Sequence, residues 1–427
     1  MKSTVVALVL FALLACGGPF GPAHLSADDP PADVSTIKSL SPDQARKLVA
    51  GYSMAEVEIV IKGRGVFKSD LVLPLNGLER LDAETAKVLA TFGGEVLSLG
   101  GLQALDAATA GALAQFQGDI FLHGLTRLDA ATAAALAQCK GDYLLLPGLE
   151  TLDAATARSL VGFGRGYLYL EGLETLDAET AAVLAAFTGH GIHLGLTRID
   201  APLAKTLSTG KFPELRLGGP ARLAPDIART LATFKGQALA LKGLATLDAE
   251  TAAALAEFKG SMLHLAGLTA LDAASATALA RFHDTLVLSG LAEIDAGAAK
   301  ALAECRGPSF YIHGLTRLDA ATAKALAGSQ KWTGQLPNVT VLDAPDSVDV
   351  AKALATRKGQ LLLENLRKVS PRTLTALLVK RDVTIPAIDR LEFIAEPDGG
   401  ASEDFVIPEW LVERERLSGA KEAANPD

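Results

Sequence analysis

The sequence predicts an α/β solenoid, a stack of strand–turn–helix units, and three observations support this fold class. A leucine or isoleucine anchor recurs every 23 or 24 residues, and each anchor except Leu223 is followed by aspartate. Alternating apolar residues precede the anchors, and alanine- and leucine-rich segments follow them. A fixed period of this length indicates one supersecondary unit stacked many times, so a binding or scaffold role is favoured over catalysis. The anchors are Leu81, Leu105, Leu128, Leu152, Leu176, Ile199, Leu223, Leu247, Leu271, Ile294, Leu318 and Leu342.

The segment 236–258 illustrates how one repeat is expected to fold. Leu239 and Leu241 alternate with smaller or polar residues, which is the period-2 pattern of a short strand. Asp248 follows the anchor at a helix N-cap position, where its carboxylate accepts a hydrogen bond from the backbone amide of Thr251. The alanines and leucines that follow are the best helix formers, and a glycine ends the helix.

Stacking these units predicts a curved molecule. Parallel strands pack ~4.8 Å apart, whereas neighbouring helices need ~8–10 Å. We therefore expect a right-handed horseshoe with a parallel sheet on its concave face and short helices on its convex face.

The repeat also resembles a known family. The strand segment of leucine-rich repeat (LRR) proteins is similar to the run Leu239-x-Leu241-x-x-Leu244-x-x-Leu247, and the following helix resembles the helical return of bacterial exported members. The resemblance covers roughly residues 71–381. It implies a solenoid without a cofactor that binds other molecules, most often proteins. The family's usual asparagine after the strand is replaced by Gly243 or its equivalents, so its buried hydrogen-bond ladder is expected to be absent.

Four segments are expected along the chain. Residues 1–27 are predicted to be a signal peptide, with an alternative lipoprotein signal ending at Ala15. Residues 28–70 are predicted to be an N-terminal cap with a degenerate repeat, and residues 71–381 an LRR-like solenoid of about 12–13 repeats. Residues 382–427 are predicted to be a C-terminal cap with an acidic, partly disordered tail.

The N-terminus predicts export. An apolar run from Val5 to Ala15 is too short to span a bilayer as a mature helix but has the length of a signal-peptide core. Residues 13–16 resemble a bacterial lipobox, which makes Cys16 the acylated first residue, and ordinary cleavage at Ala23 or Ala27 is the alternative. The protein is therefore expected either as a periplasmic or cell-envelope lipoprotein, touching the membrane only through its lipid anchor, or as a secreted protein.

Charge and cysteine usage argue against other classes. The net charge is −9 and no lysine/arginine stripe runs along the chain, which disfavours nucleic acid and anionic membrane surfaces as partners. Cys139 and Cys305 stand where other repeats carry phenylalanine and lie seven repeats apart, roughly 34 Å at ~4.8 Å per strand. A disulfide requires Cα atoms within ~7 Å, so we predict two buried free thiols.

No motif predicts catalysis, a cofactor or a metal site. The repeated aspartates lead into helices rather than glycine-rich ligand turns, so N-capping explains them better than calcium binding. The glycines at 162, 164 and 166 lead from a helix into a strand, which is the wrong order for a phosphate site. His190 and His193 are expected on opposite faces of an extended segment, which argues against a metal.

The side chains expected on the concave face form the candidate ligand-binding patch. Aromatic residues are scarce in the chain, yet tyrosines and histidines recur at these strand positions. Tyr143 and Tyr167 share a register position and are expected to stack. The alternative is that these residues only stabilise the sheet, because tyrosine and phenylalanine favour strands. The candidate residues are Phe121, His123, Tyr143, Tyr167, Tyr169, Glu171, Tyr311 and His313.

Three functions are open from the sequence. The first is a non-enzymatic extracytoplasmic binding or scaffold protein that recognises a protein or cell-envelope partner through the concave strand face, because flat amphipathic side chains are common in interface hot spots. The second is a carbohydrate-binding surface protein whose concave tyrosines stack on sugar rings. The third is a structural envelope spacer without a specific ligand.

Overall fold

The computed structural model describes residues 34–51, 58–60, 66–68, 72–396 and 405–411. The predicted signal peptide, Cys16 and most of the predicted acidic tail lie outside these ranges. The chain divides into two compact units. The first unit runs to Pro220 and includes Thr233–Gly243, and the second unit comprises Ala221–Ala232 and the chain from Leu244 onward.

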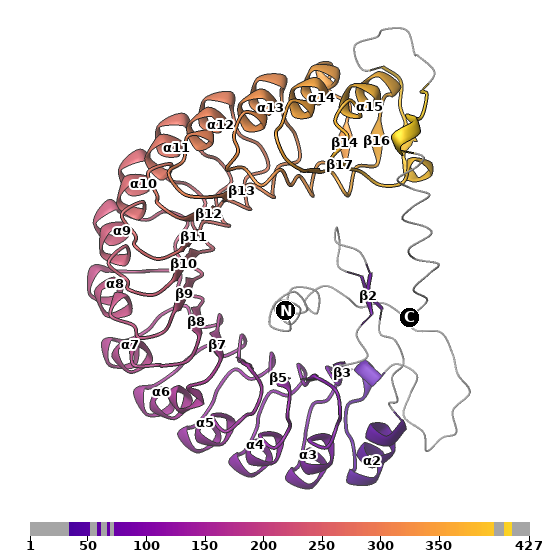
Figure 1. Cartoon of the computed structure of the whole chain (residues 1–427). Helices are drawn as coiled ribbons and strands as arrows, with labels where there is room; N and C mark the ends of the chain where they lie inside the picture. Colours follow the sequence, from indigo (N-terminus) through magenta and orange to yellow (C-terminus); the bar gives the residue numbers. More distant parts are fainter. Residues whose placement is uncertain (1–33, 52–57, 61–65, 69–71, 397–404, 412–427) are drawn as a thin grey trace. The chain divides into compact units, whose positions relative to one another are not determined.

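The first unit is a parallel sheet with helices alternating with its strands. The strands pair in sequence order from β3 to β10, and the helices form an outer row beside the inner row of strands (Figure 1). These strands are β3 (Val72–Pro74), β4 (Val96–Ser98), β5 (Asp119–Phe121), β6 (Tyr143–Leu145), β7 (Tyr167–Leu170), β8 (Gly191–Leu194), β9 (Glu214–Leu217) and β10 (Ala238–Leu241). The helices are η1 (Val34–Thr36), α2 (Pro42–Gly51), α3 (Ala83–Leu89), α4 (Ala107–Leu113), α5 (Ala130–Leu136), α6 (Ala154–Leu160), η2 (Val161–Phe163), α7 (Ala178–Ala185) and α8 (Ala201–Ser208). An antiparallel pair, β1 (Glu58–Val60) and β2 (Val66–Lys68), precedes β3.

The second unit repeats the same pattern. Its parallel strands are β11 (Met262–His264), β12 (Thr285–Val287) and β13 (Phe310–Tyr311), then β14 (Val341–Leu342), β16 (Lys368–Val369) and β18 (Glu392–Phe393), and separately β15 (Leu361–Leu362) and β17 (Val383–Thr384). The helices are α9 (Pro225–Leu231), α10 (Ala249–Leu255), α11 (Ala273–Leu279), α12 (Ala296–Ala303), α13 (Ala320–Ala327), α14 (Ser347–Ala355), α15 (Pro371–Leu377) and η3 (Ile388–Arg390). Parallel strands alternating with short helices confirm the predicted LRR-type α/β solenoid.

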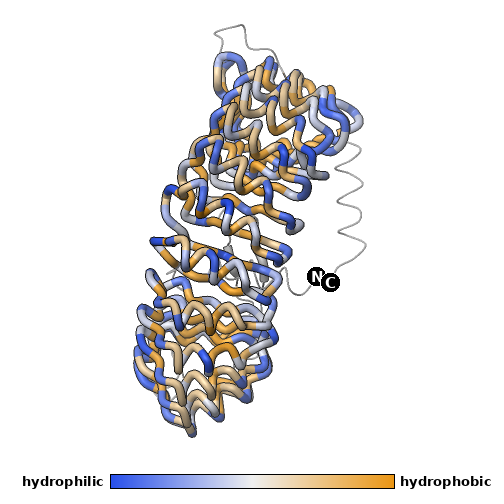
Figure 2. Tube along the Cα trace, turned by 90° about the vertical axis from the view of Figure 1, so that its left-hand side faces the viewer, coloured by the Kyte–Doolittle hydropathy of each residue, from blue (hydrophilic) through white to orange (hydrophobic). Residues whose placement is uncertain are grey.

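The core is a stack of identical layers. Leu144, Leu168 and Ile192 each point from their strands into the interior and are 0% exposed. Phenylalanines at the helix ends stack from repeat to repeat, with Phe92 and Phe116 ring centroids 6.3 Å apart. Apolar residues recur in every repeat of the trace, whereas the turns are mostly hydrophilic (Figure 2).

The two cysteines behave as predicted. Cys139 and Cys305 are buried free thiols within this layer of phenylalanines. Burial raises the pKa of Cys139 to about 12, so its thiol stays protonated and acts as a small apolar side chain.

Aspartate N-caps start most of the helices, as the repeat pattern predicts. In α10 the Asp248 carboxylate accepts a hydrogen bond from the backbone N–H of Thr251 at 2.8 Å. The prediction is wrong for Asp343, because α14 begins only at Ser347, after Asp346. Pro345 alone does not explain the later start, because α8 has a proline at the same place, Pro202, and is still capped by Asp200.

A threonine ladder joins successive repeats at the start of the helices. The Thr251 hydroxyl donates a hydrogen bond to the Leu223 carbonyl of the preceding repeat at 3.2 Å. The Thr322 hydroxyl likewise donates to the Ile294 carbonyl at 3.3 Å. Because each of these threonines lies in the first turn of its helix, the bond ties the start of that helix to the turn of the preceding repeat.

Cationic side chains replace the phenylalanine stack near the end of the second unit. Arg357 Nη1 donates to the Ser329 carbonyl at 2.8 Å, and Lys380 Nζ donates to the Arg357 carbonyl at 2.7 Å. The Arg357 guanidinium also lies 4.9 Å from the ring centre of the buried Trp332. Carbonyls at helix C-termini carry partial negative charge, so they are favourable partners for cations.

Candidate functional site

The strand face of the first unit carries its side chains in three parallel rows. Strand pairing from β5 to β9 aligns the residues of the first two rows, and the third row lies one residue beyond the paired leucines. The first row contains Tyr143, Tyr167, Gly191 and Glu214. The second row contains Phe121, Leu145, Tyr169, His193 and Arg216. The third row contains His123, Glu171, Gly195, Gly218 and Lys242.

Four aromatic side chains, Tyr143, Tyr167, Tyr169 and His193, form what we call the Tyr167 cluster. The Tyr143 and Tyr167 rings stack at 5.4 Å with an interplanar angle of 10°, which confirms the stacking expected from their register. The ring centroids of Tyr169 and His193 lie 3.8 Å apart. Such contacts contribute about 0.5–1.5 kcal/mol each beyond the area they bury, so the cluster is a rigid unit.

One expectation about the histidines is wrong. His190 and His193 were expected on opposite faces, but both rings lie near Tyr167. Their ring centroids are 5.7 and 6.0 Å from that of Tyr167. His190 precedes β8, so the strict alternation of a strand does not apply to it.

Next to the Tyr167 cluster lie four charged residues, Glu171, Glu214, Arg216 and Lys242, which we call the charged quartet. Lys242 Nζ lies 2.8 Å from Glu171 Oε1, and Arg216 is paired with Glu214. The side chains of Glu171, Arg216 and Lys242 are about one-third exposed (39%, 31% and 31%), so their charges are accessible to a partner. The quartet has no net charge, but it presents charges of both signs beside aromatic rings.

His193 lies between the two glutamates of the quartet. Its Nδ1 is 4.0 Å from Glu171 Oε1 and its Nε2 is 3.7 Å from Glu214 Oε1, while the residue is 1% exposed. Neither ring nitrogen has a hydrogen-bond partner within the described residues. Burial lowers the pKa of His193 to about 4, against the opposing pull of Glu214, so the imidazole is neutral near pH 7.

The two glutamates remain ionised. Burial by itself raises the pKa of Glu214, but the contacts with His193 and Arg216 outweigh it and lower the pKa to about 2. Burial likewise opposes ionisation of Glu171, and Lys242 reverses the balance, so the pKa of Glu171 is lowered. Each carboxylate is therefore held in place by a cation of the quartet.

A further acidic residue lies at the edge of the cluster. The Asp119 carboxylate accepts a hydrogen bond from the backbone N–H of Tyr143 at 2.9 Å and is 5% exposed. Burial raises the pKa of Asp119 to about 6, and repulsion from Asp142 acts in the same direction. Asp119 is thus an ionisable group that the fold holds in an unfavourable environment near pH 7.

The predicted patch residues differ in accessibility. Phe121, Tyr143 and Tyr169 are buried at 0%, 3% and 7% exposure, whereas Tyr167 and His123 are half-buried and Glu171 is exposed. Tyr311 and His313 belong to the second unit, where their rings make an edge contact at 5.2 Å. The first-unit residues come together as predicted, with Tyr167 as their most accessible tyrosine.

The predicted patch omitted Asp119, His193 and three members of the charged quartet. Strand alternation already indicates that His193, Glu214 and Arg216 share the face with the tyrosines. The contribution of Lys242 is less visible in the sequence, because it depends on the glycines at 195 and 218 that leave room for its side chain to cross two strands.

The Tyr167 cluster and the charged quartet together have the chemistry of a binding surface. Across the described ranges, no group of three or more histidine, cysteine, aspartate or glutamate side chains is arranged to hold a metal ion. A search of the same residues finds no helix with both the length and the apolar character to cross a membrane. An aromatic surface beside paired charges of both signs provides what a recognition surface needs.

Comparison with known proteins gives similarity at the level of the fold. No protein-family model matches the chain, and no curated protein matches it. Among solved structures, it is similar to an internalin from Listeria monocytogenes, with 14% sequence identity and a TM-score of 0.40 over 81% of this chain and 93% of the internalin chain. It is also similar to a chain of the Toll–Spätzle complex of Drosophila, with 14% identity and a TM-score of 0.34 over 73% of this chain and 49% of the other.

Proposed function

We propose that this protein is a non-enzymatic extracytoplasmic binding protein that recognises a protein or cell-envelope partner through the strand face of the first unit. The observation that carries the proposal is the contact between the Tyr167 cluster and the charged quartet. A stacked aromatic centre beside charges of both signs is typical of interface hot spots. The proposal includes export of the protein, either as a lipoprotein acylated at Cys16 or as a secreted protein.

The differences in exposure support a protein partner. Tyr167 is the tyrosine of the cluster that offers most surface, while Tyr143 and Tyr169 pack against it and fix its position. A side chain held rigid before binding loses little conformational entropy on association. Glu171, Arg216 and Lys242 would then select among partners by charge.

Carbohydrate binding and a ligand-free spacer are the alternatives. A sugar platform needs a broad open ring face, and stacking covers one face of Tyr167 with Tyr143. A spacer needs no rigid aromatic cluster on its strand face. Both are therefore less well supported than a protein partner.

A capture experiment with quantitative mass spectrometry tests the proposal. The mature chain, a Tyr167→Ser variant and an Arg158→Gln control are immobilised and exposed to envelope and secreted proteins. Arg158 lies in the outer row of the same unit and is 58% exposed, so its loss leaves the strand face intact. We expect a saturable partner that the wild type and the control retain and that Tyr167→Ser loses by at least tenfold.

The outcomes separate the three functions. Circular dichroism first establishes that the variants fold equally. A partner held equally by all three proteins would reject the proposed site. Lack of any saturable partner would favour the spacer, unless a glycan array gives a signal that Tyr167→Ser abolishes, in which case the carbohydrate alternative is correct.

A further inference from the structure

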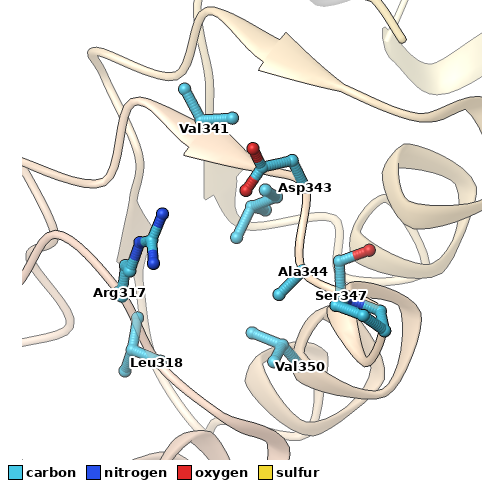
Figure 3. A pocket seen from close by; sticks show the side chains of 9 residues that line it. Arg317, Leu318, Val341, Asp343, Ala344, Ser347 and Val350 are labelled. Carbon is cyan, nitrogen blue, oxygen red and sulfur yellow. The ribbon is translucent and has the colours of Figure 1, made fainter. Parts of the chain in front are cut away.

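A groove opens in the second unit at the start of α14. Its cavity volume is about 310 Å³, and Figure 3 shows the side chains that line it. Leu318, Leu342 and Val350 supply apolar lining and are at most 8% exposed. Ligand clefts span ~300–1,000 Å³, so this groove suits a molecule of amino-acid size rather than a peptide or an oligosaccharide.

An irregular repeat creates the groove. In the preceding repeat Asp319 caps α13 by accepting from the Thr322 amide at 2.6 Å. The corresponding Asp343 does not cap α14, which begins three residues later than the pattern requires. The Asp346 carboxylate instead accepts from the Ala320 amide of α13 at 2.9 Å, which ties the two repeats together beside the groove.

The Asp343 carboxylate, which caps no helix, is therefore available to bind a ligand. Asp343 and Arg317 are both exposed, and both side chains point toward the groove in Figure 3. Within the described chain, neither side chain has an ion-pair or hydrogen-bond partner. The groove thus combines a cation, an anion and an apolar lining, and none of these charges is neutralised by the protein itself.

Comparison with a second groove shows that the free carboxylate is the unusual feature. It lies in the first unit, has a volume of about 480 Å³ and is lined by Arg198, Ile199 and Asp200, the same residue pattern as Arg317, Leu318 and Asp319. There the Asp200 carboxylate is occupied as an N-cap, accepting from the Leu203 amide at 2.8 Å. That groove offers a cation without a free carboxylate opposite it.

We propose that the groove beside α14 binds a small zwitterion with an apolar side chain, of the free α-amino acid class. The guanidinium of Arg317 matches the ligand carboxylate, because its planar N–H donors fit two carboxylate oxygens. Asp343 pairs with the ligand ammonium group. Leu318, Leu342 and Val350 take up the apolar side chain. This site is separate from the Tyr167 cluster and does not depend on its function.

Isothermal titration calorimetry with the full chain tests the proposal. The probes are leucine, valine and phenylalanine, together with leucinamide, which lacks the carboxylate, and N-acetylleucine, which lacks the ammonium charge. We expect at least one free amino acid to bind, and its singly charged analogues to bind about tenfold more weakly, a loss of about 1.4 kcal/mol.

Three variants assign the charges. Arg317→Gln should remove the preference for leucine over leucinamide, and Asp343→Asn should remove the preference for leucine over N-acetylleucine. Arg198→Gln, at the matching position of the first-unit groove, should leave both preferences unchanged. All three changes are at exposed positions, so folding is expected to be retained.

Two results would overturn the proposal. One is the absence of heat with every amino acid at millimolar concentration, confirmed by unchanged amide chemical shifts around Val341–Val350. The other is binding that Arg317→Gln and Asp343→Asn do not alter, or that Arg198→Gln alters equally, because the charges of this groove would then not be responsible.

Discussion

Lys242 Nζ contacts Glu171 Oε1 at 2.8 Å although β8 and β9 lie between their strands. Their strands are three spacings apart, ~14 Å at ~4.8 Å per strand. The contact forms because Gly195 and Gly218 occupy the same row and carry no side chain to separate the two charges. A Cβ at Gly195 would lie 1.7 Å from the Glu171 carbonyl oxygen, so this glycine is required for backbone packing as well.

A double-mutant cycle on this ion pair should give a small, salt-sensitive coupling. Both side chains are about one-third exposed, and such pairs contribute about 0.2–1 kcal/mol to stability. Unfolding of wild type, Glu171→Gln, Lys242→Met and the double variant in urea, at 0.05 and 1 M salt, measures the coupling. A coupling above 2 kcal/mol, or one that salt does not reduce, would contradict this assignment.

Acid should destabilise the first unit through His193. The unfolded imidazole has a pKa near 6.5 and the folded one about 4, so the unfolded state binds the proton more tightly. The stabilisation is complete above pH 6.5 and is lost as the pH falls toward 4, by up to about 3 kcal/mol. A His193→Gln variant cannot bind this proton. Its stability relative to wild type should therefore rise between pH 7 and pH 4.

Direct titration provides the check on His193. The imidazole C–H resonances, followed by NMR, should titrate well below pH 6. A midpoint near 6.5 would contradict a buried neutral imidazole.

Asp119 should affect the pH dependence of stability in the opposite direction to His193. Its folded pKa of about 6 exceeds the unfolded value of 3.8, so ionisation costs stability that grows between pH 3.8 and pH 6 and stays constant above. An Asp119→Asn change keeps an oxygen for the Tyr143 amide and removes the charge. It should stabilise the protein by roughly 1–3 kcal/mol at pH 7.5 but not at pH 4. An equal gain at both pH values would show that ionisation is not the cause.

The sequence predicts the repeat far better than the site. Asp248 and the other N-caps follow from one local rule, an acceptor three residues before a free amide, so a repeating pattern is sufficient to place them. Strand alternation likewise predicts that Tyr143 and Tyr167 stack. These features depend only on neighbours that the period fixes.

Three features of the structure were not predicted from the sequence. Asp343 has the same local sequence position as the capping aspartates, and the Asp-Ala-Pro sequence that it begins is also found at the normally capped start of α8, so the sequence does not indicate the later start of α14. The burial of Phe121 and Tyr143 depends on how neighbouring side chains pack, which alternation cannot specify. The threonine ladder was missed because the same threonine also supplies the capped amide, which explains its presence in the sequence without a second role.

Removing one rung of the threonine ladder should weaken the stacking of repeats. Thr251→Val keeps the shape of the side chain and leaves the Leu223 carbonyl unpaired, which should cost about 1–2 kcal/mol. Thr277→Val is the matched control, because Thr277 is exposed and bonds only within its own helix, to the Ala273 carbonyl. Equal losses in urea unfolding for both variants would mean that the contact between repeats contributes nothing beyond helix propensity.

Arg357 should be the most sensitive cation of the second unit. Its guanidinium is donor to the carbonyls of Ser329, Trp332 and Gln360, and the residue is only 7% exposed. Arg357→Met fills a similar volume but leaves these carbonyls unpaired, so we expect a loss of about 3 kcal/mol and unfolding at a lower urea concentration. Lys352→Met, on the exposed side of α14, should change stability by less than about 0.5 kcal/mol. If the two variants were equally stable, the hydrogen bonds of Arg357 would not contribute to stability. Packing of its aliphatic stem over Trp332, which methionine retains, would then be its main role.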